Sequence, residues 1–413
     1  MGTRNNTKSP REISLSELWK GHWERKAGGV LFLILFAVGI VGGLAKASWQ
    51  PQTVGLRGLL KEVSPKSRVL IVQHPEAASA FAPDLRVVRQ MIDAGIQRWV
   101  KTNSLRGAWS RLIHSNDVVG IKVYTEPGPF AGTRAAVVEA VVQSLLAAGV
   151  SPKRIVIWDK YRRDLVRVGL DKLQSRYGVA VEGAVEAGFD PKHFYDNPVP
   201  GTLVWGDLEF RPGKLIQGRH SYVTRLLTHR ITRIINIAPL LNHNGIGVCG
   251  CLYSLALGSV DNVIRFTKDP ERLAVAVPEI YARPEIHDKV ALHIVDALIG
   301  QYYGEDTGLM HYAAVLNQIR FSTDPVALDL LSVQELEALR KKYGQAPLHP
   351  SLELYHNAAI LELGEDNLRQ VEIQWLNLPA KEKAHPPRAH PKNRLDGLNG
   401  RLPRREKNAG SRT

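Results

Sequence analysis

Short runs of aliphatic and β-branched residues recur through the middle of the chain and predict buried strands. They read RVLIVQ (68–73), DVVGIKV (117–123), RIVIWD (154–159), RIINIA (233–238), VALHIVD (290–296) and NQIRFSTD (317–324). Each run is continuously apolar, which is typical of strands that are covered on both faces of a sheet. The segment LVWGDLEF (203–210) is predicted to form an edge hairpin.

A helical pattern of apolar positions lies between the second and third of these runs. The segment TRAAVVEAVVQSLLAAG (133–149) begins at Thr133, which suits an N-cap, and ends at Gly149, a typical helix stop. Strand, helix and strand in this order predict a parallel pair with a right-handed crossover. We therefore expect an α/β fold with a mixed, mainly parallel sheet flanked by helices, as one large domain over residues 60–376 plus an N-terminal transmembrane helix.

One stretch near the N-terminus contains 19 residues without a charge, AGGVLFLILFAVGIVGGLA (27–45), followed by Lys46. A helix of that length spans roughly 28 Å, close to the ~30 Å hydrocarbon core of a bilayer. Residues 27–46 are therefore predicted to be a transmembrane anchor, preceded by a basic cytoplasmic segment, residues 1–26. Arg25 and Lys26 lie just before the apolar run, and the positive-inside tendency then places the body outside the cytoplasm.

A cleaved signal peptide is the alternative to a single-pass anchor in the cell membrane. Ala45-Lys46-Ala47 has the small-x-small form of a cleavage site, and cleavage near Ala47 would release the body as a secreted protein.

The net charge of +14 is concentrated at the two ends of the chain. Residues 1–26 contain six basic and three acidic residues, and residues 381–413 contain ten and three, so only four of the fourteen net charges fall on the body. This distribution argues against a nucleic-acid partner, which requires a basic face on the folded domain. Residues 381–413 are also rich in Pro, Gly and Asn and are predicted to be a disordered basic tail.

The chain contains two cysteines, Cys249 and Cys251. An iron–sulfur cluster held by four thiolates is therefore not expected, and a disulfide-stapled scaffold is excluded. Nothing else in the sequence names a cofactor, which stays unknown.

Polar and ionisable side chains follow the predicted strands at the points where these end. They are Lys122, Asp159, Asn242, His243, Asp296 and Asp324. Ligands of open parallel sheets bind beyond the carboxyl ends of the strands, so we expect these groups at one edge of the sheet. The candidate catalytic residues are Lys122, Asp159, His243 and Asp296, with His243 as the acid or base. The remaining two, Asn242 and Asp324, are candidate ligand-binding residues.

Structural roles for these residues stay open beside the functional ones. Asp324 precedes Pro325 and suits the N-cap of a helix. Asp159 has Arg162 and Arg163 close by in the sequence as ion-pair partners. A buried Lys122 requires a counter-ion, for which Asp159 and Asp296 are candidates.

The segment NHNGIGVCGCLYSLALGS (242–259) allows several interpretations. Gly245, Gly247 and Gly250 precede an apolar helix whose backbone amides could hold an anionic ligand. The side chains of His243, Cys249 and Cys251 could ligate a soft metal ion, or a thiol near the helix N-terminus could be reactive. A tight glycine turn with small buried cysteines explains the same pattern without any ligand.

Four stretches resemble one known family: VGIKV (119–123), VVEAVVQSLLAAGVSPKRIVIWD (137–159), INIAPLLNHNGIGVCGCLYSLALGSVDNVIRF (235–266) and STDPVALD (322–329). With AAILELGEDNLRQVEI (358–373) they are similar, in order, to the family called domain of unknown function 362. The resemblance implies an α/β domain, often behind an export signal and sometimes fused to an iron–sulfur module. It implies no activity, because none is established for that family.

This chain departs from the family pattern at the presumed site. Leu241 stands where the family typically has Lys, Tyr253-Ser254 stands in place of Lys-Asn, and Tyr124 stands in place of Asn. These changes remove charge that could bind or stabilise an anion.

Two hypotheses therefore stand, and whether the protein is an enzyme stays open. The first is an envelope-facing protein that binds or transforms a small anionic or metal-associated ligand at the carboxyl edge of its sheet. The second is a non-catalytic, membrane-anchored binding or interaction protein that has lost the site lysines. Neither identifies the small-molecule ligand.

Overall fold

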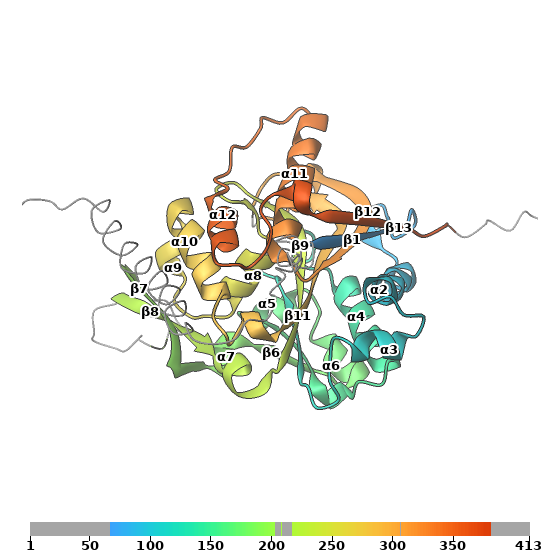
Figure 1. The fold of residues 1–413 in the computed structure, drawn as a ribbon, viewed down its shortest axis with the longest axis horizontal. Helices are drawn as coiled ribbons and strands as arrows, with labels where there is room; N and C mark the ends of the chain where they lie inside the picture. The colour runs from blue at the N-terminus through green and yellow to red at the C-terminus, as the bar shows by residue number, and fades with distance from the viewer. Residues whose placement is uncertain (1–66, 203–207, 209–216, 306, 381–413) are drawn as a thin grey trace, which may run out of the picture. The chain divides into compact units, whose positions relative to one another are not determined.

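A computed structural model of the chain describes residues 67–202, 208, 217–305 and 307–380 (Figure 1). The predicted segment 1–26, the anchor 27–46 with the cleavage site at Ala47, and the tail 381–413 lie outside the described residues. The same is true of the predicted hairpin 203–210, apart from one residue. Among the helices of the described ranges, none has the length and apolar character needed to cross a membrane.

The described strands form a nine-stranded sheet in the order β13-β1-β12-β11-β9-β4-β5-β6, with β10 paired to β9. Five neighbouring strands from β11 to β6 run parallel, while β12 runs antiparallel to both of its neighbours. The mixed, mainly parallel sheet expected from the sequence is confirmed. The strands are β1 (Arg68–Gln73), β4 (Val119–Val123), β5 (Ile155–Asp159), β6 (Ala180–Gly183), β9 (Arg233–His243), β10 (Gly247–Val248), β11 (Val290–Gln301), β12 (Ala313–Ser322) and β13 (Glu372–Asn377).

Two small ribbons accompany the sheet. One pairs β2 (Ala78–Ser79) with β3 (Ala82–Pro83), and the other pairs β7 (Phe189–Thr202) with β8 (Gln217–Thr224), both antiparallel.

Helices cover both faces of the large sheet (Figure 1). On one face lie α2 (Leu85–Trp99), α3 (Leu105–Ser110), α4 (Ala135–Ala147), α5 (Arg162–Arg167) and α6 (Lys172–Tyr177), which share one apolar cluster with the sheet. The other face carries α7 (Ala184–Ala187), α8 (Cys251–Gly258), α9 (Ile264–Thr267), α10 (Pro270–Tyr281), α11 (Pro325–Lys342) and α12 (Glu353–Ile360), which share a second cluster.

The continuous apolar runs explain this three-layer arrangement. Nine consecutive residues of β9 are buried, because neighbouring side chains point to opposite faces and each face has its own helical layer. A fully buried Val, Leu or Ile side chain contributes about 1.5–3 kcal/mol to stability, so both layers are strongly held to the sheet.

The predicted N-cap of α4 is wrong, although the helix and its end are as expected. The helix begins at Ala135 with Arg134 as its N-cap residue, and Gly149 follows it with a φ of +94°. Instead of capping, the Thr133 hydroxyl donates to the carbonyl of Ile237 and accepts from the amide of Tyr124. Thr133 therefore joins β4 to β9 at the edge where these strands end.

Candidate functional site

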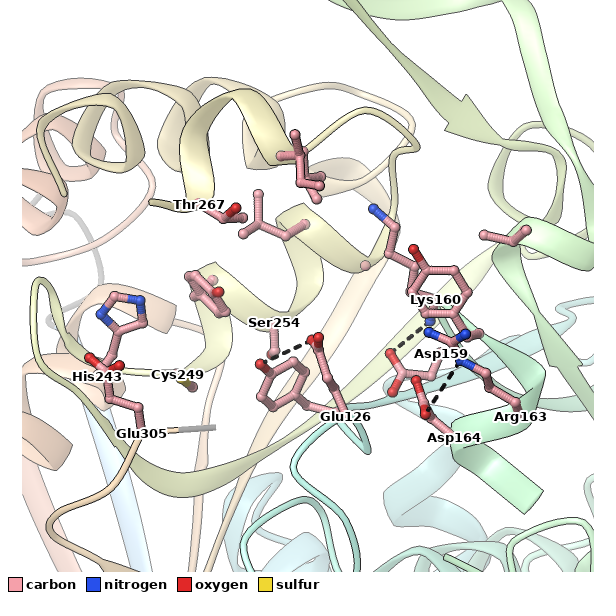
Figure 2. A pocket seen from close by; sticks show the side chains of 18 of the residues that line it. Glu126, Asp159, Lys160, Arg163, Asp164, His243, Cys249, Ser254, Thr267 and Glu305 are labelled. Atoms are coloured by element: carbon pink, nitrogen blue, oxygen red, sulfur yellow. Dashed lines mark hydrogen bonds and ion pairs between the residues drawn. The ribbon is translucent and has the colours of Figure 1, made fainter. Parts of the chain in front are cut away.

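A cavity of about 900 Å³ opens at the carboxyl ends of β4, β5 and β9. We call it the strand-end cavity. Figure 2 shows Asp159, Lys160 and Arg163 on one side of it and His243, Cys249 and Glu305 on the other. Charged lining residues are Glu126, Asp159, Lys160, Arg163, Asp164, Glu186, Lys268 and Glu305, and the lining rings are Tyr124, Tyr161, His243 and Tyr253.

Lys122 and Asp159 form a buried ion pair beneath this cavity. The distance between Lys122 Nζ and Asp159 Oδ1 is 2.8 Å, and the side chains are 0% and 5% exposed. This contact meets the requirement that a buried Lys122 have a carboxylate nearby, and it shows that the suggested pairing of Asp159 with Arg162 or Arg163 is wrong. Lys122 does not itself line the cavity.

The carboxylate of Asp159 is fully occupied by the protein. Oδ1 accepts from Lys122 Nζ and from the amide of Lys160, both at 2.8 Å. Oδ2 accepts from the amide of Thr125 at 2.7 Å and from its hydroxyl at 2.6 Å. Asp159 therefore ties the end of β4 to the end of β5, and its oxygens have little capacity left to act on a ligand.

His243 reaches the cavity from the last residue of β9. Its Nδ1 accepts from the amides of Gly245 and Ile246 at 3.1 and 3.3 Å, so the ring proton of the neutral imidazole is on Nε2. The ring packs on Tyr253 with a centroid distance of 5.3 Å. The glycine turn thus orients the imidazole, and Nε2 is the nitrogen that could exchange a proton with a ligand.

Asp296 does not join the other three candidate catalytic residues. In the sheet, Lys122, Asn236 and His293 are direct neighbours across the strands, and Asp296 lies three residues beyond His293 on the same strand. Side chains alternate between faces, so Asp296 points to the opposite face from Lys122. There it accepts from the amide of Arg134 at 2.9 Å and forms an ion pair with the guanidinium at 3.1 Å. Asp296 thus binds both the amide and the guanidinium of Arg134, the residue that precedes α4.

Asp324 lies at the other edge of the sheet, because β12 is antiparallel. Its Oδ1 accepts from the amide of Ala327, which confirms the N-cap role, and Oδ2 accepts from the Ser67 hydroxyl and the Glu365 amide. The expectation that Asp324 would share an edge with Asp159 is wrong.

The predicted anion at the N-terminus of α8 is present, but it belongs to the protein. Asp329 of α11 accepts from the amides of Cys251 and Leu252 at 2.6 and 3.0 Å. A Cβ on Gly250 would lie 2.1 Å from Asp329 Oδ1, so only glycine permits this approach. The candidate anion site at these amides is therefore filled by a side chain.

The other predicted ligands of the glycine segment are structural. Gly247 has a φ of +94°, and a Cβ on Gly245 would lie 2.6 Å from Pro270. Asn242 is 1% exposed, and its Oδ1 accepts from the amide of Glu305 at 3.2 Å. These residues shape the turn and position its neighbours, and none of them lines the cavity.

The proposed metal site of His243, Cys249 and Cys251 is not formed. Within the described ranges, no group of three His, Cys, Asp or Glu side chains has the geometry to hold a metal ion. Cys249 packs with Tyr124 and Leu241, while Cys251 belongs to the core between α8 and α11. Burial raises the pKa of the Cys251 thiol well above its usual range, so the interpretation as a reactive thiolate is also wrong for this residue.

The strand-end cavity contains side chains that the sequence pattern does not single out. Lys160 and Arg163 lie one and four residues after Asp159, and Glu305 follows β11. The same rule that selects Asp159 applies to the first few residues after each strand, so it could have identified Lys160 and Arg163. Tyr253 and Ser254 lie on α8, where only the folded arrangement shows that they face the cavity.

Acidic groups of the cavity are largely engaged by protein donors. Asp164 forms an ion pair with Arg167 at 3.2 Å, and its pKa is raised by burial. Glu186 accepts from the amide of Arg162, and Glu305 accepts from that of Asn244. Arg163, by contrast, has a side chain that is 77% exposed and lies 3.9 Å from Asp164.

Comparison with known proteins assigns no family. No family model matches the sequence, and no curated protein matches it. A crystal structure of a protein from Thermotoga maritima, a structural-genomics target, is similar with 16% identity and a TM-score of 0.34. The match covers 62% of this chain and 59% of that chain, so it spans less than two thirds of that protein. A similarity of this size identifies neither a family nor an activity.

Proposed function

We propose that this protein binds a small anionic ligand in the strand-end cavity. The observation that supports the proposal is which charged groups of the cavity are paired within the protein and which are exposed. Asp159, Asp164 and Glu186 each have a cation or backbone amide bound to them, whereas Arg163 and Lys268 line the cavity as exposed cations. An anion of the ligand would be attracted by these cations, and at Arg163 it would compete only with the long, solvent-exposed contact to Asp164 at 3.9 Å.

Binding is favoured over acid–base catalysis. Lys122 is held by Asp159 below the cavity, and Asp296 is on the opposite face of the sheet. His243 is then the candidate catalytic residue that combines access to the cavity with a proton on Nε2. One oriented imidazole supports ligand binding, whereas the four-residue constellation expected for catalysis is not assembled.

The departures from the domain of unknown function 362 pattern support the same choice. Tyr124 and Leu241 lie in one small apolar cluster, and Tyr253 packs against it. If the chain belongs to that family, the polar residues it lacks would have met at this one wall. A cavity that lost them together has less charge with which to stabilise a developing anion, so an anionic ligand would depend on the remaining cations Arg163 and Lys268.

The cellular setting of the proposal comes from the sequence. Residues 27–46 anchor the protein in the cell membrane, with the body outside the cytoplasm, or are removed near Ala47. The ligand would in either case be encountered outside the cytoplasm.

Calorimetric titration of the full-length chain with inorganic phosphate and with acetate tests the proposal. We expect saturable binding of at least one of them that weakens as salt is raised, because the attraction is between charges. Arg163→Gln should weaken binding about three- to tenfold, as expected for the loss of one charged hydrogen bond. Arg86→Gln, which removes an exposed arginine on α2, is the matched control and should bind like the wild type. Absence of binding, or equal affinity in both variants, would refute the proposal.

A further inference from the structure

One wall of the strand-end cavity is built from aromatic rings. Tyr124 and Tyr253 pack edge to face, with centroids 6.1 Å apart and an interplanar angle of 89°. His243 lies against Tyr253 at 5.3 Å. These rings come from the residue after β4, from α8 and from the end of β9, and all three line the cavity. We call these three residues the ring wall.

The ring wall is backed by apolar packing at Tyr124. Tyr124 is 7% exposed and packs with Leu241 and Cys249 in a buried cluster. Further along the cavity, Leu257, Val263 and Ile264 add aliphatic lining, and Ile264 is 38% exposed. Aromatic rings and exposed aliphatic side chains in one cavity are typical of a site that binds an apolar, flat group.

Ser254 supplies an independent sign of a ligand. Its side chain lines the cavity and is 1% exposed, and its hydroxyl has no hydrogen-bond partner within the described part of the chain. A buried hydroxyl without a partner costs free energy, so such groups are normally satisfied by a ligand or by water. In Figure 2, Ser254 is drawn between the side with His243 and the side with Lys160 and Arg163.

The cationic side of the cavity is distinct from the ring wall. Lys160 and Arg163 come from the end of β5 and the start of α5, and the Lys160 ammonium donates to the carbonyl of Asp261 at 2.6 Å. Arg163 lies over the ring of Tyr161 at 4.5 Å, with its guanidinium largely in solvent. The cavity thus offers flat apolar surface on one side, and on the other the cations Lys160 and Arg163 beside the protein-bound carboxylates of Asp159 and Asp164.

We propose that the ligand is an aromatic or conjugated ring that carries a carboxylate or phosphate group. The ring lies against Tyr253 and Tyr124, the anionic group is directed to Arg163 and Lys160, and Ser254 donates a hydrogen bond to an oxygen of that group. This inference rests on the proposed binding of an anion and adds the requirement for a ring. Catalysis is no part of it.

Three probes with the same phosphate group test the binding of an anion separately from the requirement for an aromatic ring. They are inorganic phosphate, phenyl phosphate and cyclohexyl phosphate, each titrated into the full-length chain. We expect phenyl phosphate to bind about two- to tenfold more tightly than cyclohexyl phosphate, because an aromatic pair is favoured beyond the area it buries. Inorganic phosphate should bind more weakly than both.

Substitutions at the ring wall locate the preference. Tyr253→Leu should remove the preference for phenyl over cyclohexyl phosphate, while Tyr253→Phe should retain the preference. Tyr343→Leu, at a tyrosine that does not line the strand-end cavity, is the control. Ser254→Ala loses no hydrogen bond of the free protein and should weaken all three phosphates about two- to fivefold with an unchanged melting temperature.

The outcomes are distinct. Binding of inorganic phosphate without a preference for phenyl phosphate overturns the ring requirement and leaves the anion site standing. A preference that survives Tyr253→Leu overturns the placement of the ring on this wall. Failure of all three phosphates to bind overturns the inference and, if acetate also fails, the proposed function with it. If Tyr253→Leu does not fold, the comparison of phenyl with cyclohexyl phosphate on the wild type still tests the ring requirement, and the Ser254→Ala titration still tests the hydrogen bond.

Discussion

Lys122 is the residue whose contacts hold the strand ends beneath the strand-end cavity. Its ammonium donates to Asp159 and to the carbonyl of Val123, and it lies 5.5 Å from the centre of the Trp158 ring. A charge with no exposure to solvent is tolerated because its partner is close and is itself saturated with hydrogen bonds. The pair is therefore a structural link between β4 and β5 that keeps both strand ends in position beneath the strand-end cavity.

Replacing Lys122 with methionine should destabilise the protein by about 3–5 kcal/mol, because Asp159 is left buried without its cation. Urea unfolding measures the loss. Lys172→Met, at an exposed position of α6, is the control and should change stability by less than about 0.5 kcal/mol. Adding Asp159→Asn to Lys122→Met should recover part of the loss, since the remaining buried charge is removed. A loss below about 1 kcal/mol for Lys122→Met would contradict the structural role.

At the scale of elements, helix α8 determines the shape of the cavity. Its N-terminus is fixed by the Asp329 carboxylate, and its other end approaches Lys122 so closely that a Cβ on Gly258 would lie 2.2 Å from Lys122 Cε. Tyr253 and Ser254 lie between these two fixed ends. Any change that moves α8 therefore moves the ring wall.

Gly258→Ala should shift α8 away from the sheet and cost about 1–3 kcal/mol, as overpacking in a core does. Phenyl phosphate binding should weaken in the same variant, because Tyr253 moves with the helix. Gly308→Ala is the control: a Cβ there would make ordinary van der Waals contacts, the nearest at 3.5 Å, so this substitution should change stability far less. Wild-type stability in Gly258→Ala would show that the contact between α8 and Lys122 can accommodate a methyl group.

The capping of α8 should depend on pH. Burial raises the pKa of Asp329 to about 7, against the opposing effect of the two amides. Because the folded pKa lies above the unfolded one, the native state binds more protons, and stability should fall as pH rises from about 4 to about 7 and then level off. The difference in unfolding free energy between the wild type and Asp329→Asn isolates this effect. A difference that is constant from about pH 4 to about pH 8 would contradict it.

Much of this architecture follows from the sequence, and the failures of sequence-based prediction have physical causes. Continuous apolar runs predict β1, β4, β5, β9, β11 and β12, since a strand buried on both faces can tolerate few polar residues. The direction of β12 is not encoded in such a run, so the pattern alone places Asp324 at the wrong edge. The face of the sheet to which Asp296 points depends on the register of β11, and the register therefore decides whether its carboxylate contacts Lys122 or Arg134. The ring wall requires contacts between three distant segments, which no local pattern shows.

At the scale of the whole molecule, the described body ends on an edge strand. β13 pairs in parallel with β1 along six residues, from Arg68 with Glu372 to Gln73 with Asn377. The basic residues 381–413 come after this strand, and their composition provides few apolar side chains for docking. The fold should therefore depend on β13 and be indifferent to the residues beyond Ala380.

Truncation after Ala380 should leave the melting temperature within about 2–4 °C of the full-length value, which corresponds to ~1 kcal/mol in a domain of this size. Truncation after Val371 is the matched comparison, because it also removes β13 and uncovers the edge of β1. That shorter chain should melt well below the first. A large drop for the Ala380 truncation would show that the tail packs on the body.

The N-terminal region provides the last prediction, which concerns topology. Residues 27–45 form a run that can span a bilayer as a helix, and the basic residues Arg25 and Lys26 before it favour a cytoplasmic N-terminus. Protease added to spheroplasts should therefore digest the body. Leu35→Arg should impair insertion, since an arginine at the centre of a span costs about 2.5–3.5 kcal/mol on the insertion scale, and it should leave the body protected inside the cell. The mass of the wild-type product separates the two export routes: an intact N-terminus indicates an anchor, whereas a chain that begins near Ala47 indicates a cleaved signal. A body that resists protease in intact spheroplasts, with the wild-type sequence, would exclude both routes and place the ligand of the strand-end cavity in the cytoplasm.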